Sequence, residues 1–514
     1  MVKLKKKAAY YIKRAFGNFK ERKWCIVGYI FLVLLFTLNN IEIPLQGNPL
    51  TKEQITIVFF VIFIGIFCFL AYSPRIYNFI FIVIILFGTV TAFVTPILDS
   101  PDESVHLRRS ELTSRGNLLP EIDNEKGYSV ITSVVDLTDE TKKTVLQTKI
   151  DAQPINYNFE AVQHVANANP FFGYIPQALG INLAKTLNLN AIWLIWFGRI
   201  SNVIMAAFVC RQAVKIAPAF KMHLALVACF PMTIYQFASL SIDATINSFA
   251  LLVIAYFLNF YYKDNKTIGI KECFTFLLIC LIVTFSKITY VFLILLFLLI
   301  PKCKFISKSV NRFKYFIIFI AFLISVCWYI FTSMLPNIPN DHTAYLLANH
   351  IDMLEQIKFI LHNPLNVTIL FIKNIIQEGP AMLSSMFTFG ALSYNLGSAF
   401  IIYGIFYGAI AVMYPNQVGK INLKSKIGIT FICIFVYIST ILVFYLTWST
   451  VGQFNISGVQ GRYFIPLLGL LPLVLNVNYQ KENFPDTLKL DKITILMFLF
   501  FISLMIIDTA FLYY

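Results

Sequence analysis

The apolar run YNFIFIVIILFGTVTAFVTPI (residues 77–97) leads directly into the polar segment LDSPDESVHLRR (residues 98–109). A run of this length can cross the ~30 Å hydrocarbon core of a bilayer as a helix. The segment that follows places two adjacent carboxylates, a histidine and two arginines where the chain leaves the membrane. Charged groups beside a bilayer are costly, so this cluster indicates a functional site.

The composition supports a membrane protein throughout. Of the 514 residues, 58% are hydrophobic and only 13% are charged, and the mean hydropathy is +0.72. Soluble domains carry roughly 25% charged residues. Apolar runs of about 18 residues or more recur from end to end. They are continuous rather than alternating, which predicts an all-α polytopic membrane protein and argues against a β-barrel.

Hydropathy in sliding windows predicts about 13 transmembrane helices. The predicted spans are residues 24–42, 54–72, 77–97, 190–209, 222–240, 244–262, 272–286, 288–301, 315–333, 395–414, 427–448, 463–478 and 492–512.

Basic residues predict the orientation of these spans. They give the chain a net charge of +15 and gather in the N-terminus and in short loops on one side of the predicted topology. The positive-inside rule makes that side cytoplasmic. The long loops 98–189 and 334–394 then lie outside, where long ordered loops commonly carry function.

The predicted organisation therefore has six parts. They are a basic cytoplasmic lead (1–23), the first three spans (24–97), the first outer loop with the acidic motif (98–189), spans four to nine (190–333), the second outer loop with interfacial helices (334–394) and spans ten to thirteen (395–514). Within the second outer loop, the amphipathic stretch 357–376 fits a helix lying in the membrane interface. No internal repeat is visible, which weakens a transporter interpretation.

The acidic motif has a structural and a chemical interpretation. Ser100 could be the N-cap of a helix that starts at Pro101, with Glu103 as the returning partner of a capping box. In that helix Asp102, His106 and Arg109 share one face. A carboxylate beside an imidazole and a guanidinium could act as a general base or bind phosphate. If Glu103 serves the cap, Asp102 is the freer base.

A divalent metal ion is an alternative ligand for the same loop. Glu103 and His106 form an E-x-x-H pair, of which carboxylate-bridged metal sites need two copies. Glu160 and His164 offer a second carboxylate–imidazole pair. The cysteines lie in or beside apolar runs, which argues against a disulfide framework and a cysteine metal site.

Three further positions on the predicted outer face carry polar groups. Gln460, Arg462 and Tyr463 start a span, and the arginine either grips a phosphate or snorkels at the membrane edge. Lys287 lies between two apolar runs and either pairs with an anion or snorkels. Asp243 opens a span, where it could equally be a helix cap. The topology brings these positions to the same face as Asp102, which favours a common site.

These residues also carry a resemblance to a known family. The chain resembles bacterial polytopic membrane proteins of unknown function that are grouped with the GT-C glycosyltransferase superfamily. The motifs that carry it are Pro101-Asp102-Glu103-x-x-His106, Asn169-Pro170…Pro176, Gly198-Arg199-Ile200-Ser201-Asn202, Pro231…Gln236 through Asp243, Ser286-Lys287…Tyr290 and Gln460-Gly461-Arg462-Tyr463-Phe464-Ile465-Pro466. They span roughly residues 95–475.

The resemblance implies a GT-C-like bundle and a membrane transferase that takes a sugar from a polyprenyl-phosphate carrier on the extracytoplasmic side. The acceptor would be a cell-wall or other surface polysaccharide, or a lipid-linked glycan, and the enzyme would sit in the bacterial cell membrane. The carboxylate of the first outer loop would be catalytic, hence Asp102, with Glu103 second. Arg462 and Lys287 would meet the donor phosphate.

Residue chemistry adds constraints and alternatives to this expectation. Asp102 and Glu103 are adjacent and would point apart on a helix, whereas retention by a covalent route needs two carboxyl groups about 5 Å apart. We therefore expect inversion. His106, Arg109, Asp243, Gln460 and Tyr463 complete the expected substrate-binding set. The alternatives are a flippase or transporter of a lipid-linked saccharide and a polysaccharide polymerase or ligase; no nucleic-acid partner is expected.

Overall fold

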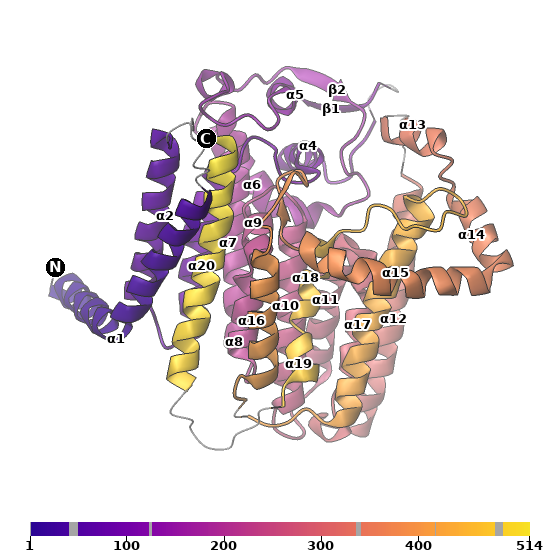
Figure 1. Cartoon of the computed structure of the whole chain (residues 1–514). Helices are drawn as coiled ribbons and strands as arrows, with labels where there is room; N and C mark the ends of the chain where they lie inside the picture. Colours follow the sequence, from indigo (N-terminus) through magenta and orange to yellow (C-terminus); the bar gives the residue numbers. More distant parts are fainter. Residues whose placement is uncertain (1, 41–49, 123–125, 336–340, 417, 478–486) are drawn as a thin grey trace.

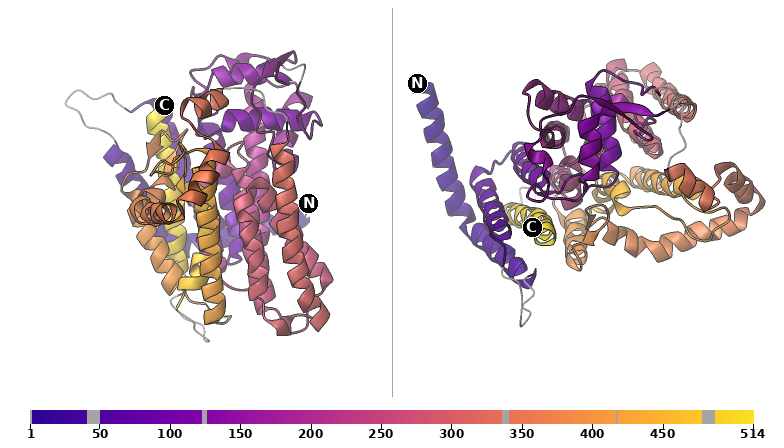
Figure 2. Two further views of the ribbon diagram at one scale, coloured as in Figure 1. Left: turned by 90° about the vertical axis from the view of Figure 1, so that its right-hand side faces the viewer. Right: turned by 90° about the horizontal axis from the view of Figure 1, so that it is seen from above.

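A computed structural model describes residues 2–40, 50–122, 126–335, 341–416, 418–477 and 487–514 of the chain. Helices run side by side in one bundle, and a cap of short helices and strands covers one end (Figure 1). We call this the α4 end, after the helix Glu103–Ser114 that it contains. Seen from above, α1 (Val2–Asn40) and α13–α15 (Asp341–Ser385) lie on opposite sides of the bundle (Figure 2).

Seven helices among the described residues are long and apolar enough to cross a membrane, or eight if a bent pair counts as one span. These are the helices whose apolar runs are uninterrupted. They are α2 (Lys52–Ala71), α3 (Ile76–Val94), α7 (Ile192–Ile216), α10 (Asp243–Tyr262), α12 (Lys308–Ser333), α17 (Leu423–Thr447) and α20 (Thr487–Tyr513).

The predicted count of about 13 spans is not confirmed, because other apolar runs form shorter or broken helices. Proline stands in the first turn of α9, α18 and α19, where its missing N–H and fixed φ start a new helix instead of continuing the old one. The elements concerned are α8 (Lys221–Ala228), α9 (Pro231–Phe237), α11 (Ile270–Ser286), the 3₁₀ helices η3 (Ile288–Leu299) and η4 (Lys302–Lys304), α16 (Ala399–Met413), α18 (Ile465–Leu468) and α19 (Leu471–Leu475).

The N-terminal segment is one continuous helix, so α1 runs through the predicted boundary at residue 23. It packs against α2 and α20. The Tyr29 hydroxyl lies 2.7 Å from Ser503 Oγ of α20 and donates to Val61 O of α2 at 3.1 Å. A Cβ at Gly65 would lie 2.2 Å from the Tyr29 ring, so the close approach of α1 and α2 requires glycine there.

The predicted first outer loop folds into an ordered cap. Its strands β1 (Tyr128–Ile131) and β2 (Phe159–Val162) pair antiparallel, with Tyr128 opposite Val162. Leu107 of α4, Val130 and Ile181 belong to one buried cluster that joins the cap to α7. The remaining elements of the cap are α5 (Thr132–Asp139), η1 (Ile150–Ala152), η2 (Phe171–Tyr174) and α6 (Ile175–Thr186).

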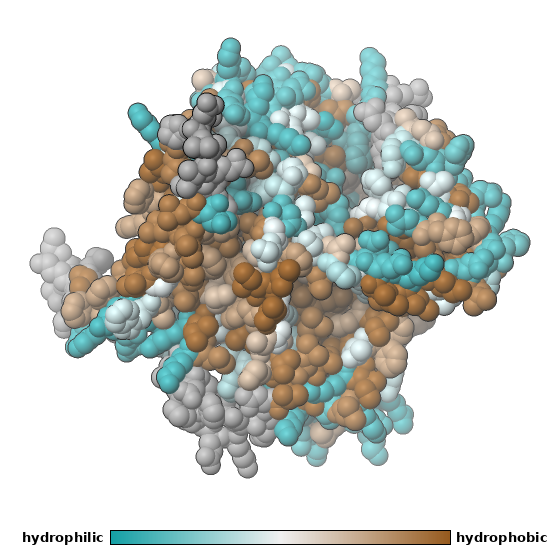
Figure 3. Space-filling model, viewed as in Figure 1, coloured by the Kyte–Doolittle hydropathy of each residue, from teal (hydrophilic) through white to brown (hydrophobic). Residues whose placement is uncertain are grey.

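The predicted second outer loop contains three helices and a small hairpin. Helix α14 (Met353–His362) is followed directly by α15 (Pro364–Ser385), and the segment Thr343–His362 meets α15 at an angle of 104°, because Pro364 starts α15. Helix α15 lies across the bundle, with apolar residues on its lower side and polar residues above (Figure 3). The amphipathic stretch 357–376 is thus helical, while its place in the membrane interface stays a prediction. The other elements are α13 (Asp341–Ala348), β3 (Thr388–Phe389) and β4 (Tyr394–Asn395).

Candidate functional site

Asp102 is the exposed carboxylate of the acidic motif. It immediately precedes α4 with φ 60°, in the left-handed region that Asp tolerates better than most residues, and its side chain makes no capping hydrogen bond. Seventy-one per cent of the side chain is exposed. The helix begins at Glu103 rather than at the predicted Pro101, so Asp102 is free to face a ligand.

Glu103 has the opposite environment, which corrects its place as a second catalytic candidate. Its Oε1 accepts hydrogen bonds from Arg199 Nε at 2.8 Å and Leu240 N at 3.0 Å. Its Oε2 accepts from Arg199 Nη2 at 2.7 Å and Ser100 N at 3.2 Å. The last bond is the Glu103 half of the predicted capping box, although no side chain caps the helix from Ser100. Both oxygens are therefore used to hold the fold.

Arg199 explains why a cation lies inside an apolar helix. Its guanidinium is 1% exposed and also donates to the carbonyl oxygens of Ala92 (3.0 Å), Thr95 (2.8 Å) and Pro96 (2.8 Å). Arg199 and Glu103 thus tie the end of α3, the start of α4 and α7 together around one buried ion pair.

Arg462 joins two carboxylates from distant parts of the chain. It lies in the 3₁₀ helix η5 (Gly461–Phe464) and is 5% exposed. Its Nη2 is 3.5 Å from Asp102 Oδ2, and its Nη1 is 3.5 Å from Asp243 Oδ2. Gln460 Oε1 accepts from Arg462 Nε at 2.6 Å. The predicted convergence of Asp102, Asp243, Gln460 and Arg462 is therefore present.

Asp243 is held in place by residues that sequence reasoning did not single out as site residues. Gln236 Nε2 donates to Asp243 Oδ2 at 2.7 Å, and Gln236 Oε1 accepts from Asn247 Nδ2 at 2.5 Å. Asn247 lies four residues after Asp243 in α10, a spacing that places both on one helix face. That spacing was the available signal for Asn247.

Lys287 contacts the aromatic ring of Tyr463, the residue next to Arg462. Its Nζ lies 3.3 Å from the centroid of the Tyr463 ring, a distance typical of a cation–π contact. Two further contacts hold Tyr463 in place. The Phe444 ring stacks on the Tyr463 ring with centroids 5.3 Å apart, and the Tyr290 hydroxyl donates to Tyr463 O at 2.6 Å. We call Asp102, Asp243, Lys287 and Arg462 the charged cluster; its formal charges sum to zero.

His106 lies behind the charged cluster in a hydrogen-bonded row. The Tyr174 hydroxyl accepts from Asn169 Nδ2 at 2.8 Å and lies 2.7 Å from His106 Nδ1. The other ring nitrogen of His106, Nε2, lies 3.5 Å from Ser241 Oγ. Ser241 Oγ in turn accepts from Asp243 N at 3.1 Å.

Burial sets the protonation of this row. It lowers the pKa of His106 below its ordinary 6.5, although the nearby carboxylates of Asp102 and Asp243 act in the opposite direction. It also raises the pKa of Tyr174, whose hydroxyl stays protonated. His106 is thus a neutral, 8% exposed positioning residue for Ser241 and Asp243.

Arg109 has a structural role instead of the predicted contact with substrate. Its side chain is fully buried and its Nη2 donates to Leu118 O at 2.7 Å and Asn169 O at 3.4 Å. Its Nη1 donates to Asn117 O at 3.3 Å. These bonds fasten the chain after α4 to the segment before η2, away from the exposed side of Asp102.

The metal alternative gains no support from this geometry. Among the described residues, no group of three His, Cys, Asp or Glu side chains could hold a metal ion. Glu103 is engaged with Arg199, and Glu160 is exposed on β2. The nine cysteines are free thiols.

An apolar cavity is lined by residues close in sequence to two members of the charged cluster. It has a volume of about 440 Å³ and lies between α6, α7, α10 and α11. Thr245 and Phe285 line it, two residues from Asp243 and Lys287 respectively. Two other wall residues, Ile175 and Leu278, are 41% and 62% exposed, so the cavity borders the apolar outer surface of the bundle.

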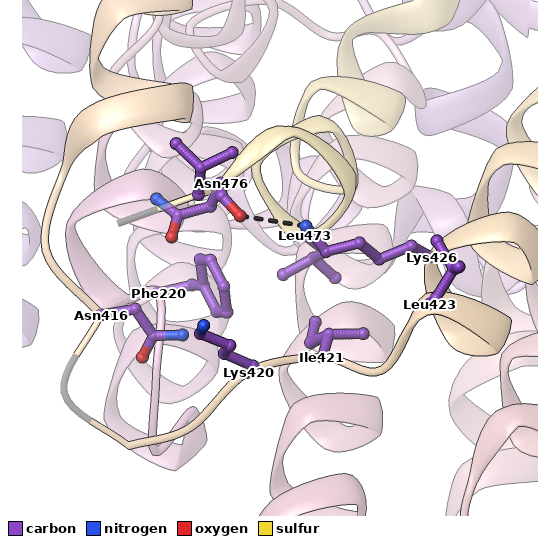
Figure 4. A pocket seen from close by; sticks show the side chains of 9 residues that line it. Phe220, Asn416, Lys420, Ile421, Leu423, Lys426, Leu473 and Asn476 are labelled. Atoms are coloured by element: carbon purple, nitrogen blue, oxygen red, sulfur yellow. Dashed lines mark hydrogen bonds between the residues drawn. The ribbon is translucent and has the colours of Figure 1, made fainter. Parts of the chain in front are cut away.

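A pocket of about 340 Å³ at the opposite end of the bundle is less informative (Figure 4). Lys426 Nζ donates to Val474 O at 2.8 Å and Asn476 O at 3.0 Å. Asn476 Nδ2 donates to Ala411 O at 3.2 Å and Tyr414 O at 2.9 Å. These polar groups attach α17 and α16 to the chain after α19.

Comparison with known proteins identifies the family. Residues 85–471 match the family described as "Predicted membrane protein (DUF2142)", and since this is most of the chain, the protein belongs to that family of membrane proteins of unknown function. The predicted resemblance to such a family is confirmed. No curated protein and no solved structure matches the chain. The match includes the whole charged cluster and leaves α1, α2 and α20 outside.

Proposed function

We propose that this member of the family is a membrane glycosyltransferase of GT-C type, which moves a sugar from a polyprenyl-phosphate carrier to a surface glycopolymer. The observation that carries the proposal is the contact of one buried guanidinium, Arg462, with the carboxylates of Asp102 and Asp243, beside Lys287. An accessible carboxylate next to fixed cations is what transfer from a phosphate-linked donor requires.

Asp102, Arg462 and Lys287 of the charged cluster have direct roles in this reaction, and Asp243 holds Arg462 in place. The Asp102 carboxylate takes the proton of the acceptor hydroxyl, whose oxygen forms a bond to the anomeric carbon of the donor. The bond from that carbon to the phosphate oxygen breaks, and polyprenyl phosphate leaves with the electron pair. Arg462 and Lys287 stabilise the leaving phosphate. A single displacement inverts the anomeric centre and needs one base, which we assign to the exposed Asp102, because Asp243 is engaged by Gln236 and Arg462.

The apolar cavity between α6, α7, α10 and α11 supports a lipid-linked donor. A polyprenyl chain needs an apolar surface that continues to the bilayer, and the cavity borders the exposed apolar residues Ile175 and Leu278. The basic loops lie at the opposite end from α4. Under the positive-inside rule we propose that the α4 end is extracytoplasmic, in a bacterial cell membrane with the N-terminus inside.

The test is sugar transfer by membranes carrying Asp102→Asn. We expect loss of transfer from a radiolabelled polyprenyl-phosphate sugar to the surface glycopolymer, with expression and thermal stability unchanged. Asp151→Asn, which changes an exposed carboxylate in the cap far from Arg462 in sequence, is the matched control and should retain transfer. Unchanged transfer by Asp102→Asn would exclude the proposed base.

Two other outcomes would replace the proposal. Movement of labelled lipid-linked sugar across proteoliposomes without a new glycosidic bond would indicate a flippase. A shortened surface polymer in a deletion strain, rather than a missing side branch, would indicate a polymerase or ligase.

A further inference from the structure

A second, polar pocket lies on the upper side of α15. It has a volume of about 220 Å³ and lies between the middle of α15 and the segment that connects α17 to η5. In Figure 1 this segment runs above α15. The side chains that matter are Asn366, Lys373, Asn374, Gln377 and Glu378 of α15 and Phe454 of the connecting segment.

The lining of this pocket suits a neutral ligand with many hydroxyl groups. Carboxamides donate and accept hydrogen bonds at once, as hydroxyl groups do, and Asn366, Asn374 and Gln377 supply three of them. Lys373 and Glu378 balance each other in charge, so an anionic ligand has no net attraction to the pocket. Phe454 is 74% exposed and offers an apolar ring face at the rim.

Asn374, which lines the pocket, has a side-chain oxygen without a hydrogen-bond donor among the described residues. The residue is 5% exposed, and its Oδ1 accepts no hydrogen bond from any residue that the structure describes. A buried acceptor without a donor is unfavourable, and most such groups in proteins are paired. This oxygen is also closed to water, so a ligand hydroxyl reaches it only when the Asn374 side chain turns toward the pocket.

Both elements that form the pocket are connected to the 3₁₀ helix η5, which carries Arg462. The segment that carries Phe454 continues directly into η5. Helix α15 ends at Ser385, whose Oγ accepts from Gly461 N at 2.7 Å. From Asn374 to the end of α15 is eleven residues, which is about 16 Å at the helical rise. A ligand that reached from Asn374 to the charged cluster would be a chain of linked sugars rather than one monosaccharide.

We propose that the α15 pocket binds a saccharide chain, namely the acceptor glycan, and holds it with its growing or branching residue toward Asp102. This inference rests on the proposed function, because it supplies the second substrate of that transfer. It assigns acceptor recognition to Asn374, Gln377 and Phe454, apart from the charged cluster that meets the donor.

The experiment is binding of the full-length protein in detergent to a printed array of defined oligosaccharides. We compare wild type, Asn374→Leu, Phe454→Ala and Asp102→Asn. Ile376→Ala is the matched control, because Ile376 is 70% exposed on α15 but does not line the pocket. Thermal melting of each variant checks folding, and the exposed Phe454 gives a variant that does not disturb the interior.

Wild type, Asp102→Asn and Ile376→Ala should bind the same oligosaccharides, while Asn374→Leu and Phe454→Ala bind at least about tenfold more weakly. Absence of oligosaccharide binding by wild type, or equal binding by both pocket variants, would overturn the inference even if Asp102→Asn abolishes transfer. A third outcome is that the pocket variants bind more weakly but the wild-type protein transfers no sugar. That result would refute the transferase proposal and the acceptor role, and it would leave only a saccharide-binding pocket.

Discussion

Glu103→Gln should destabilise the protein, although it changes only one charge beside the proposed catalytic aspartate. The carboxylate accepts four hydrogen bonds at 2.7–3.2 Å, two of them from Arg199. A carboxamide keeps one acceptor oxygen and turns an NH₂ group toward donors. The guanidinium of Arg199, 1% exposed, would then have no counter-charge.

The expected magnitude follows from this burial. Removing one partner of a buried ion pair costs about 3–5 kcal/mol. Glutamine retains one oxygen, so we expect the lower end, about 3 kcal/mol, which in a chain of this size lowers Tm by about 3 °C. Asp102→Asn changes a 71% exposed side chain at 3.5 Å from its partner and should leave Tm unchanged.

A thiol-reactive dye is a suitable assay. Cys68, Cys210, Cys229, Cys273 and Cys280 are free and buried, so they react only when the bundle opens. The double variant Glu103→Gln/Arg199→Met should be no less stable than Glu103→Gln alone, because the unpaired charge is gone. Equal melting of Glu103→Gln and wild type would refute the buried ion pair as a structural element.

Three further changes test the site and its support. Arg462→Lys cannot contact both carboxylates at once and should lower kcat/KM for sugar transfer at least about tenfold; full activity would exclude a need for the bridging guanidinium. Gly461→Ala would place a Cβ 2.1 Å from Met382 O, and displacement of η5 should cost about 1–3 kcal/mol and reduce transfer, whereas Gly404→Ala, with no atom within 4 Å, should be neutral in both assays. His106→Gln should reduce the loss of stability on acidification. Since burial lowers the pKa of His106 below 6.5, the unfolded chain binds more protons below that pH, and wild type should lose stability there while the variant loses less; parallel melting curves from about pH 7 to 5 would contradict this.

The sequence predicted the uninterrupted spans better than the broken ones. Continuous apolar runs such as 77–97 correspond to long helices such as α3. The runs 222–240 and 463–478 are also apolar but are split near Pro231, Pro466 and Pro472, which a hydropathy window does not register. Hydrophobicity therefore predicts where the chain is buried, and proline decides where a helix stops.

The site shows a similar division. The one-sided topology was enough to bring Asp102, Asp243, Lys287 and Arg462 together as candidates. It could not separate Asp102 from Glu103, because adjacent positions on a helix face different neighbours and only the packing of α7 supplies Arg199 on one side. The sequence indicated acid–base chemistry but not which neighbour was already occupied.

The packing of α20 has a consequence for how the protein is made. Helices α1 and α2 leave the ribosome well before their partner α20, and Tyr29 meets Ser503 across 474 residues. Contacts so distant in sequence form late in folding. The nascent α1 and α2 must therefore wait until α20 has been synthesised, and a chain truncated before Thr487 leaves their inward faces without this partner.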